Sequence, residues 1–115
     1  MSAPGRSHVM RFAAAEAQIP GPPGAHSVSL LLRGSLDLKL SLPVEPNQQT
    51  PHTQDEIYVI ARGEGVIVHD GKRDRVAAGD SIFIAAGTEH HFENFSADLA
   101  VWVIFYGPAD GELPA

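Results

Sequence analysis

Hydrophobic and polar residues alternate along much of the chain beyond residue 25, and this alternation indicates β-strands. The clearest example is SLDLKLSL at 35–42, where leucine occupies every second position and Ser, Asp, Lys and Ser lie between. A strict period of two is typical of a half-buried strand with its apolar side chains on one face. The pattern therefore predicts an all-β fold built from short strands.

Turn signals divide residues 26–106 into about eight such strands. Gly and Pro interrupt the apolar runs, and Asp70-Gly71 is a dipeptide favoured in tight hairpins. The last run carries hydrophobic residues on both faces, which predicts a central strand or one covered by a partner. The expected strands are 26–32, 35–42, 56–61, 65–69, 74–78, 81–85, 90–95 and 99–106. Short strands with frequent turns are typical of a sandwich or barrel, whose interior holds side chains or one small ligand.

The remaining segments are expected to flank or interrupt this barrel. Residues 1–25 are expected to form an N-terminal tail, in which 11–19 make one or two helical turns before the PGPPG stop at 20–24. Three prolines make 43–51 a loop, because proline lacks a backbone donor and favours extended shapes before it. Residues 107–115 are expected to form a C-terminal tail. A chain of 115 residues has room for one domain with one core.

Composition narrows the classes of function. The formal net charge is −6 and the Lys and Arg residues are scattered, so binding to nucleic acid is not expected. No apolar run is long enough for a bilayer span, and FAAAEAQI near the N-terminus lacks the apolar core of a secretory signal. We therefore expect a cytoplasmic protein without a membrane partner. The chain has no cysteine, which excludes disulfides and thiolate metal sites.

Histidine and carboxylate residues remain as possible metal ligands. His52 and Glu56 lie just before and at the start of an expected strand. Positions four apart on a straight strand are about 13 Å apart, so a shared ion requires a bend, which Pro51 and the polar residues after His52 permit. Both side chains suit Zn, Fe, Mn, Ni or Cu, but from this spacing alone ordinary loop residues are the preferred interpretation. His90 and His91 point to opposite faces of a strand, and the alternation does not decide which one faces the interior.

The segment GDSIFIAAGTEHHFEN at 79–94 resembles the second sequence motif of the cupins. The residues that occupy motif positions are Gly79, Gly87, His90 and Asn94. One position differs, because Ala85 stands where the motif has proline.

The first cupin motif has counterparts earlier in the chain. His52, Glu56 and Gly63 fall in register with its second histidine, its glutamate and its final glycine. Thr50 stands where the motif has its first histidine. With both motifs in order, and with PHTQDE and WVIFYG, the chain resembles the small single-domain cupins.

This resemblance implies a fold, a cofactor and a set of ligands. The fold is the cupin jelly roll, a double-stranded β-helix barrel of about eight antiparallel strands. The implied ligands of a divalent transition metal (Fe, Mn, Ni or Zn) are His52, Glu56 and His90, which requires a bend before Glu56 and selects His90 over His91. Cupins that resemble this chain are usually dimers, so a homodimer is expected.

The threonine at position 50 leaves this expected site with two imidazoles and one carboxylate. Such a set resembles the facial triad that suits Fe(II) and leaves positions open. The amide oxygen of Gln54 is a candidate for a fourth, weaker ligand, although a solvated loop residue is the preferred interpretation. One imidazole fewer lowers the expected affinity, so a weakened or absent metal site is the alternative.

Two more residues are candidates for catalysis. Tyr58 has the parity of Glu56, so its hydroxyl could face the cavity for hydrogen bonding or proton transfer, although a core tyrosine is preferred. His69 ends an expected strand beside a turn, where a solvated histidine is the usual case and a role in the pocket is the alternative.

Three functions stay open. The first is a metal-dependent oxygenase or isomerase that acts on a small organic molecule inside the barrel. The second is a non-catalytic module that binds a small ligand, and the third is an oligomeric scaffold whose metal site has decayed. The chain has no glycine pattern of a nucleotide-binding loop and no GxSxG segment, which argues against nucleotide cofactors and covalent nucleophiles.

Overall fold

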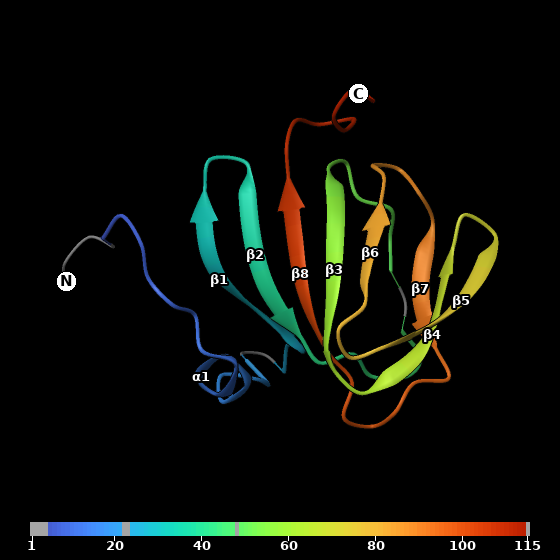
Figure 1. Ribbon diagram of the computed structural model, residues 1–115, viewed down its shortest axis with the longest axis horizontal. Helices are drawn as coiled ribbons and strands as arrows, with labels where there is room; N and C mark the ends of the chain where they lie inside the picture. Colours follow the sequence, from blue (N-terminus) through green and yellow to red (C-terminus); the bar gives the residue numbers. More distant parts are fainter. Residues whose placement is uncertain (1–4, 22–23, 48, 115) are drawn as a thin grey trace.

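The computed structural model describes residues 5–21, 24–47 and 49–114. The described residues form a short helix and eight strands, arranged as two antiparallel sheets (Figure 1). The elements are α1 (Phe12–Glu16), β1 (Ser27–Arg33), β2 (Leu36–Ser41), β3 (Asp55–Arg62), β4 (Glu64–His69), β5 (Lys72–Ala77), β6 (Ser81–Ile84), β7 (His90–Glu93) and β8 (Ala100–Tyr106). The large sheet has the order β1-β2-β8-β3-β6 and the small sheet the order β5-β4-β7. This arrangement confirms the predicted all-β jelly roll.

Each strand overlaps one that the alternation predicted. β8 lies in the middle of the large sheet, as its two apolar faces predicted, whereas cover by a partner stays a prediction. The helix spans Phe12–Glu16 and is therefore shorter than the expected helical segment 11–19.

Parts of the expected tails and loops lie outside the described residues. These are residues 22–23 of the expected helix stop at 20–24, residues 1–4 and 115 of the tails, and residue 48 of the proline-rich loop. No helix in the described part of the chain is long and apolar enough to cross a membrane.

The polar face of β2 points into the space between the sheets. Residues directly opposite each other in antiparallel strands share a face of the sheet. Lys39 lies opposite Val103 of β8, which lies opposite Tyr58 of β3, and the last two are core residues. Leu40 lies opposite Trp102, on the outer face. The regular alternation of this segment therefore predicted a strand correctly, but its leucines face outward and its polar residues face the interior.

The helix lies near the lower ends of β1 and β2 in Figure 1, and it contacts β2. The ring of Phe12 meets that of Trp102 edge to face, with centroids 6.1 Å apart. Arg62 joins the helix to β3, since its guanidinium lies 5.2 Å from the Phe12 ring centre and 2.5 Å from the Glu16 carboxylate. Leu40 has no exposed surface. The N-terminal segment thus buries outward-facing apolar side chains that the barrel itself does not enclose.

The main core lies between the two sheets. The large sheet contributes Tyr58, Ile60, Ile84, Val101 and Val103, and the small sheet contributes Ile67, Val76 and Phe92. The rings of Tyr58 and Phe92 lie 5.1 Å apart, so the two sheets are in direct contact. Removal of this apolar surface from water is the main force that holds the sheets together.

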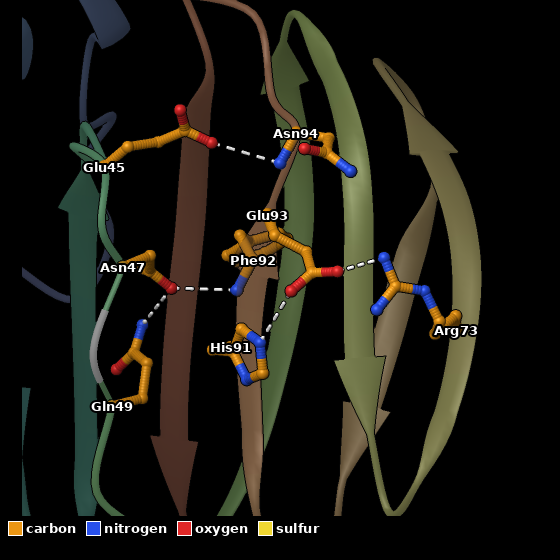
Figure 2. Close-up of polar contacts among 8 residues, drawn as sticks. All are labelled: Glu45, Asn47, Gln49, Arg73, His91, Phe92, Glu93 and Asn94. Carbon is orange, nitrogen blue, oxygen red and sulfur yellow. Dashed lines mark hydrogen bonds and ion pairs between the residues drawn. The ribbon is translucent and has the colours of Figure 1, made fainter.

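The loop that precedes β3 covers the edge of the small sheet. Figure 2 shows Asn47 and Glu45 beside β7, at the edge of the sheet. The backbone N–H of Phe92 donates to Asn47 Oδ1 at 2.8 Å, and that of Asn94 donates to Glu45 Oε1 at 3.1 Å. Side chains thereby satisfy backbone groups that an edge strand leaves unpaired.

Gly63 lies at the short connection between β3 and β4, where two chain segments approach closely. Its φ is +84°, and an added Cβ would lie 2.5 Å from Ser96 Oγ and 2.9 Å from the Leu99 Cα. Real Cβ atoms do not approach other atoms so closely. This position therefore requires glycine for both its backbone conformation and its space.

Replacing Gly63 tests this close approach. Gly63→Ala should lower the free energy of unfolding by about 3 kcal/mol, because backbone strain and overpacking add. Gly79→Ala is the matched control, since Gly79 also has a positive φ (+98°) but nothing within 4 Å of the added Cβ. Strain alone should cost the control about 1 kcal/mol. Urea unfolding measures both losses, and equal losses would contradict the proposed clash.

Asp55 fastens three segments at the start of β3. One carboxylate oxygen accepts a hydrogen bond from the Ala86 N–H at 3.0 Å, and the other accepts one from the Glu112 N–H at 2.9 Å. The N–H of Glu112 and then that of Ala86 hold the pKa of the Asp55 carboxyl below its ordinary value of 3.8. The residue is only 4% exposed, and it joins the β6–β7 loop and the C-terminal segment to β3.

The lowered pKa of Asp55 predicts a loss of stability in acid. Its stabilising contribution is complete above the unfolded-state pKa, near pH 4, and is lost as the pH falls through the lower folded-state pKa. The free energy of unfolding of the wild type should therefore fall below about pH 4. In Asp55→Asn this fall should be smaller, and stability at pH 7 should already be reduced. Urea unfolding across the pH range measures both slopes, and identical slopes would exclude Asp55 as the source.

Candidate metal centre

The chain bends before β3 and brings His52 close to Glu56. Two backbone hydrogen bonds hold the bend, from Gly87 N to His52 O at 2.7 Å and from Asp110 N to Thr53 O at 2.7 Å. The ligand atoms of His52, Glu56 and His90 all lie within 4.8 Å of one another. The structure therefore gathers the three residues that the cupin motifs indicated.

Glu56 and His90 face each other in the dry interior. Glu56 is 1% and His90 is 4% exposed, and Glu56 Oε1 lies 3.1 Å from His90 Nε2. Neither atom has a hydrogen-bond partner with suitable geometry among the residues that the structure describes. Buried polar atoms without partners are costly, and a metal ion between them would satisfy both. This pair of unsatisfied atoms fits a metal ligand set.

A carbonyl on the far side of His90 fixes the orientation of its ring. His90 Nδ1 lies 2.9 Å from the Thr88 carbonyl oxygen, which can only accept, so Nδ1 carries the proton and donates it. In the neutral ring Nε2 then presents a lone pair toward Glu56. Ligating histidines commonly use such a contact to orient the ring.

The two histidines differ in their affinity for protons. Burial lowers the pKa of His52, and the nearby His90 and Lys39 act in the same direction against the opposing effect of Glu56. Burial also disfavours the charged form of His90, but Glu56 and the Thr88 carbonyl outweigh it and raise the pKa of His90. A metal ion must displace the His90 proton, so metal affinity should fall as the pH is lowered.

A small cavity opens beside this group of residues. Its volume is about 120 Å³. The lining residues are Ser27, Lys39, Ser41, Pro43, Gln49, His52, Glu56, Tyr58, Phe92, Val101, Val103 and Phe105. Burial, with the charge of Glu56, raises the pKa of Tyr58 far above its ordinary value. The phenol therefore stays protonated and can donate a hydrogen bond, but it is a poor base.

A larger hollow of about 670 Å³ lies outside, between β7 and residues Glu45, Pro46, Asn47 and Gln49. Gln49 and Phe92 line both the hollow and the inner cavity, so these two side chains lie between the two spaces. On the same side, Glu93 contacts His91 and Arg73 (Figure 2). The His91 hydrogen bond, followed by Arg73, lowers the pKa of Glu93. His91 therefore lies on the outer surface. This agrees with the cupin motif, which indicated His90 and not His91 as the residue that faces the interior.

Two candidate residues have other contacts in the structure. The Gln54 amide nitrogen donates to the carbonyl oxygens of Ser35 and Gly107, at 2.9 Å each. His69 Nε2 lies 2.7 Å from Asp74 Oδ2. Neither Gln54 nor His69 is among the described residues that line the inner cavity. The Gln54 amide nitrogen thus bridges two segments, and His69 lies outside the residues that line the cavity; a ligand role for the Gln54 oxygen and a catalytic role for His69 stay predictions.

Sequence analysis missed four polar residues of the cavity, Ser27, Lys39, Ser41 and Gln49. Lys39 belongs to the polar stripe of β2, which an alternating pattern does not assign to the inside or the outside. Gln49 lies in the proline-rich loop beside Thr50, and Thr50 itself is exposed. The position of the first motif histidine therefore supplies no buried ligand, while its neighbour reaches the cavity.

Comparison with known proteins agrees with this geometry. Residues 42–106, more than half of the chain, match the cupin domain family. The chain belongs to this family. The matched residues include the segments of both motifs and the three clustered residues, His52, Glu56 and His90.

Individual relatives are more distant. The uncharacterized protein SCO3923 of Streptomyces coelicolor is 37% identical over 62 residues, which are 54% of this chain and 59% of the relative. This cupin therefore spans less than two thirds of that relative. The plu4264 protein of Photorhabdus luminescens has a TM-score of 0.62 at 22% identity, over 70% of this chain and 73% of its own. A predicted oxalate decarboxylase of Thermotoga maritima has a TM-score of 0.53 at 25% identity, over 69% of this chain and 76% of its own.

Metal analysis of His90→Ala tests the centre. Wild-type protein offered Fe, Mn, Ni and Zn in turn should retain one of them stoichiometrically after gel filtration. His90→Ala should lower the affinity by more than about 100-fold, because removal of a ligand costs at least as much as removal of its supporting contacts. His91→Ala is the matched control and should keep the ion, since His91 lies on the outer surface. A wild type that retains none of the four ions would exclude the centre.

Proposed function

We propose that this cupin binds a divalent transition metal through His52, Glu56 and His90 and acts on a small organic molecule in the adjoining cavity. The observation that carries the proposal is the pair of buried, unsatisfied atoms, Glu56 Oε1 and His90 Nε2, beside the His52 ring. Without an ion, Glu56 Oε1 and His90 Nε2 can satisfy each other only when His90 carries a second proton, whereas a divalent metal ion would be bound by both atoms.

In the proposed centre, some residues would bind the metal, others orient the ligands or the substrate, and others exclude water. When bound, the metal would act as a Lewis acid toward a substrate oxygen or activate dioxygen, as in oxygenases and isomerases. Thr88 holds the His90 ring in place, and Tyr58 can donate a hydrogen bond to a substrate or to Glu56. Phe92 and Phe105 line the cavity and keep it partly dry, which strengthens polar interactions inside it.

The relatives support this class of chemistry without naming the reaction. The Thermotoga maritima protein is a predicted oxalate decarboxylase, and oxalate is a small organic acid. A non-catalytic binding module is the second candidate, and the exposed Thr50 favours it, because a centre with three protein ligands holds its ion less tightly. The homodimer and the cytoplasmic location stay predictions.

A screen with metal-loaded protein separates the two candidates. The wild type should turn over at least one compound from a set of small acids, enols and phenols, measured by oxygen uptake and product analysis. Glu56→Gln should reduce the rate by at least about 100-fold, because it removes the anionic ligand while keeping the shape. Equal rates in both proteins would place the activity outside this centre. A compound that raises the melting temperature of the metal-loaded wild type without turnover would favour the binding module.

A further inference from the structure

Lys39 places a positive charge inside the barrel. It projects from the inner face of β2 and lines the cavity together with His52 and Glu56. Lys39 lies two strands away from Tyr58 in the large sheet, which is a backbone separation of about 10 Å. The ammonium group at the end of its long side chain can therefore reach a ligand that is bound near the histidines. Its side chain is 31% exposed, which leaves it partly covered by the cavity walls.

The protein gives this ammonium group little neutralisation. Asp37 Oδ2 is 4.0 Å from Lys39 Nζ, at the limit of an ion pair, and the other oxygen of Asp37 already accepts a hydrogen bond from Ser29 Oγ at 2.9 Å. The second contact is the ring of Phe105, whose centre lies 5.9 Å from Nζ. An ammonium group has three donors, so Lys39 keeps donors that a ligand can use.

Phe105 separates the lysine from the metal-binding residues. Its ring lies 4.6 Å from the His52 ring, edge to face, and it also contacts the Lys39 ammonium group. The cavity therefore has two polar ends with an apolar wall between them. The hydroxyl-bearing residues Ser27 and Ser41 line the cavity near the lysine end, where they lie opposite each other on the inner face of β1 and β2.

We propose that Lys39, with Ser27 and Ser41, forms a subsite that binds the carboxylate of a small substrate whose other end lies at the metal-binding residues. This subsite rests on the proposed function, and it names the class of substrate as a short carboxylic acid with a second oxygen-bearing group.

The charge of the cavity supports an anionic substrate. Glu56 supplies one negative charge, a divalent ion would supply two positive charges, and Lys39 supplies one more. These three groups would then carry a surplus of two positive charges, of which Asp37, 4.0 Å from Lys39, offsets a part; an acid with two oxygen anions can neutralise the rest. A neutral substrate would leave this surplus uncompensated in a partly dry space.

The size of the cavity limits the substrate to a few carbon atoms. Its volume of about 120 Å³ is well below the roughly 300–1,000 Å³ that is usual for drug-sized ligands. Hydroxy acids, keto acids and dicarboxylic acids of about two to four carbons are of the right size.

The test compares Lys39→Met with wild type by calorimetric titration of metal-loaded protein. The probes are glycolate, malonate and succinate, with malonamide as the neutral counterpart of malonate. At least one acid should bind the wild type about ten-fold or more tightly than Lys39→Met, because a charge-assisted hydrogen bond is lost. Malonamide should bind both proteins equally weakly. Met keeps the length of the lysine stem, and Lys39→Gln is the second variant if Lys39→Met fails to fold.

Two controls separate this subsite from the metal centre. Lys72→Met removes the other lysine of the chain, which is exposed on β5, and should bind every acid as the wild type does. Metal content should be the same in the wild type and both lysine variants. If the metal is retained but the wild type and Lys39→Met have equal affinity for every acid, or bind none, the carboxylate subsite is wrong while the metal centre stands. If the wild type takes up no metal, the proposed function itself fails.

Discussion

The contact between Glu56 and His90 joins the two sheets at the centre of the molecule. Glu56 comes from β3 of the large sheet and His90 from β7 of the small one, and the two ligand atoms meet where water is excluded. Such a contact costs free energy unless something satisfies both atoms. The apolar core, with Tyr58 packed on Phe92, brings the sheets together and bears this cost. The barrel is therefore stabilised by its apolar layers, and this polar point is available for a ligand.

The strands could be predicted from sequence because their signal is local. A period of two and a dipeptide such as Asp70-Gly71 act over a few residues, and the hairpin turn does have positive φ at both positions (49° and 75°). The meeting of His52 and Glu56 is different. It depends on hydrogen bonds from Gly87 and Asp110, which lie far along the chain, so spacing alone gave no reason to prefer a shared ion. Only the cupin motifs indicated the bend.

Local sequence patterns also do not show which face of a strand points into the interior. Alternation shows that Leu40 and Lys39 lie on opposite faces, but pairing with β8 and the cover provided by α1 decide which face is inside. In this cupin the helix packs on Trp102, which lies opposite Leu40 on the outer face, while Lys39 lines the cavity. Gln54 shows the same limit, because the Ser35 and Gly107 carbonyl groups that hold it come from segments far away along the chain.

Asp55 and Glu56 are neighbours in the sequence, but their side chains make different contacts. Asp55 binds the backbone of two flanking loops, while Glu56 faces the interior, so the ligand strand is held in place from behind at the residue before the ligand. A ligand residue whose backbone is held in this way has less conformational freedom left to lose when an ion arrives. It also has little freedom to adapt its position to the ion. The barrel would therefore discriminate between metals by the coordination geometry that it imposes, and ions that need a different arrangement of ligands would bind less well than their intrinsic affinity suggests.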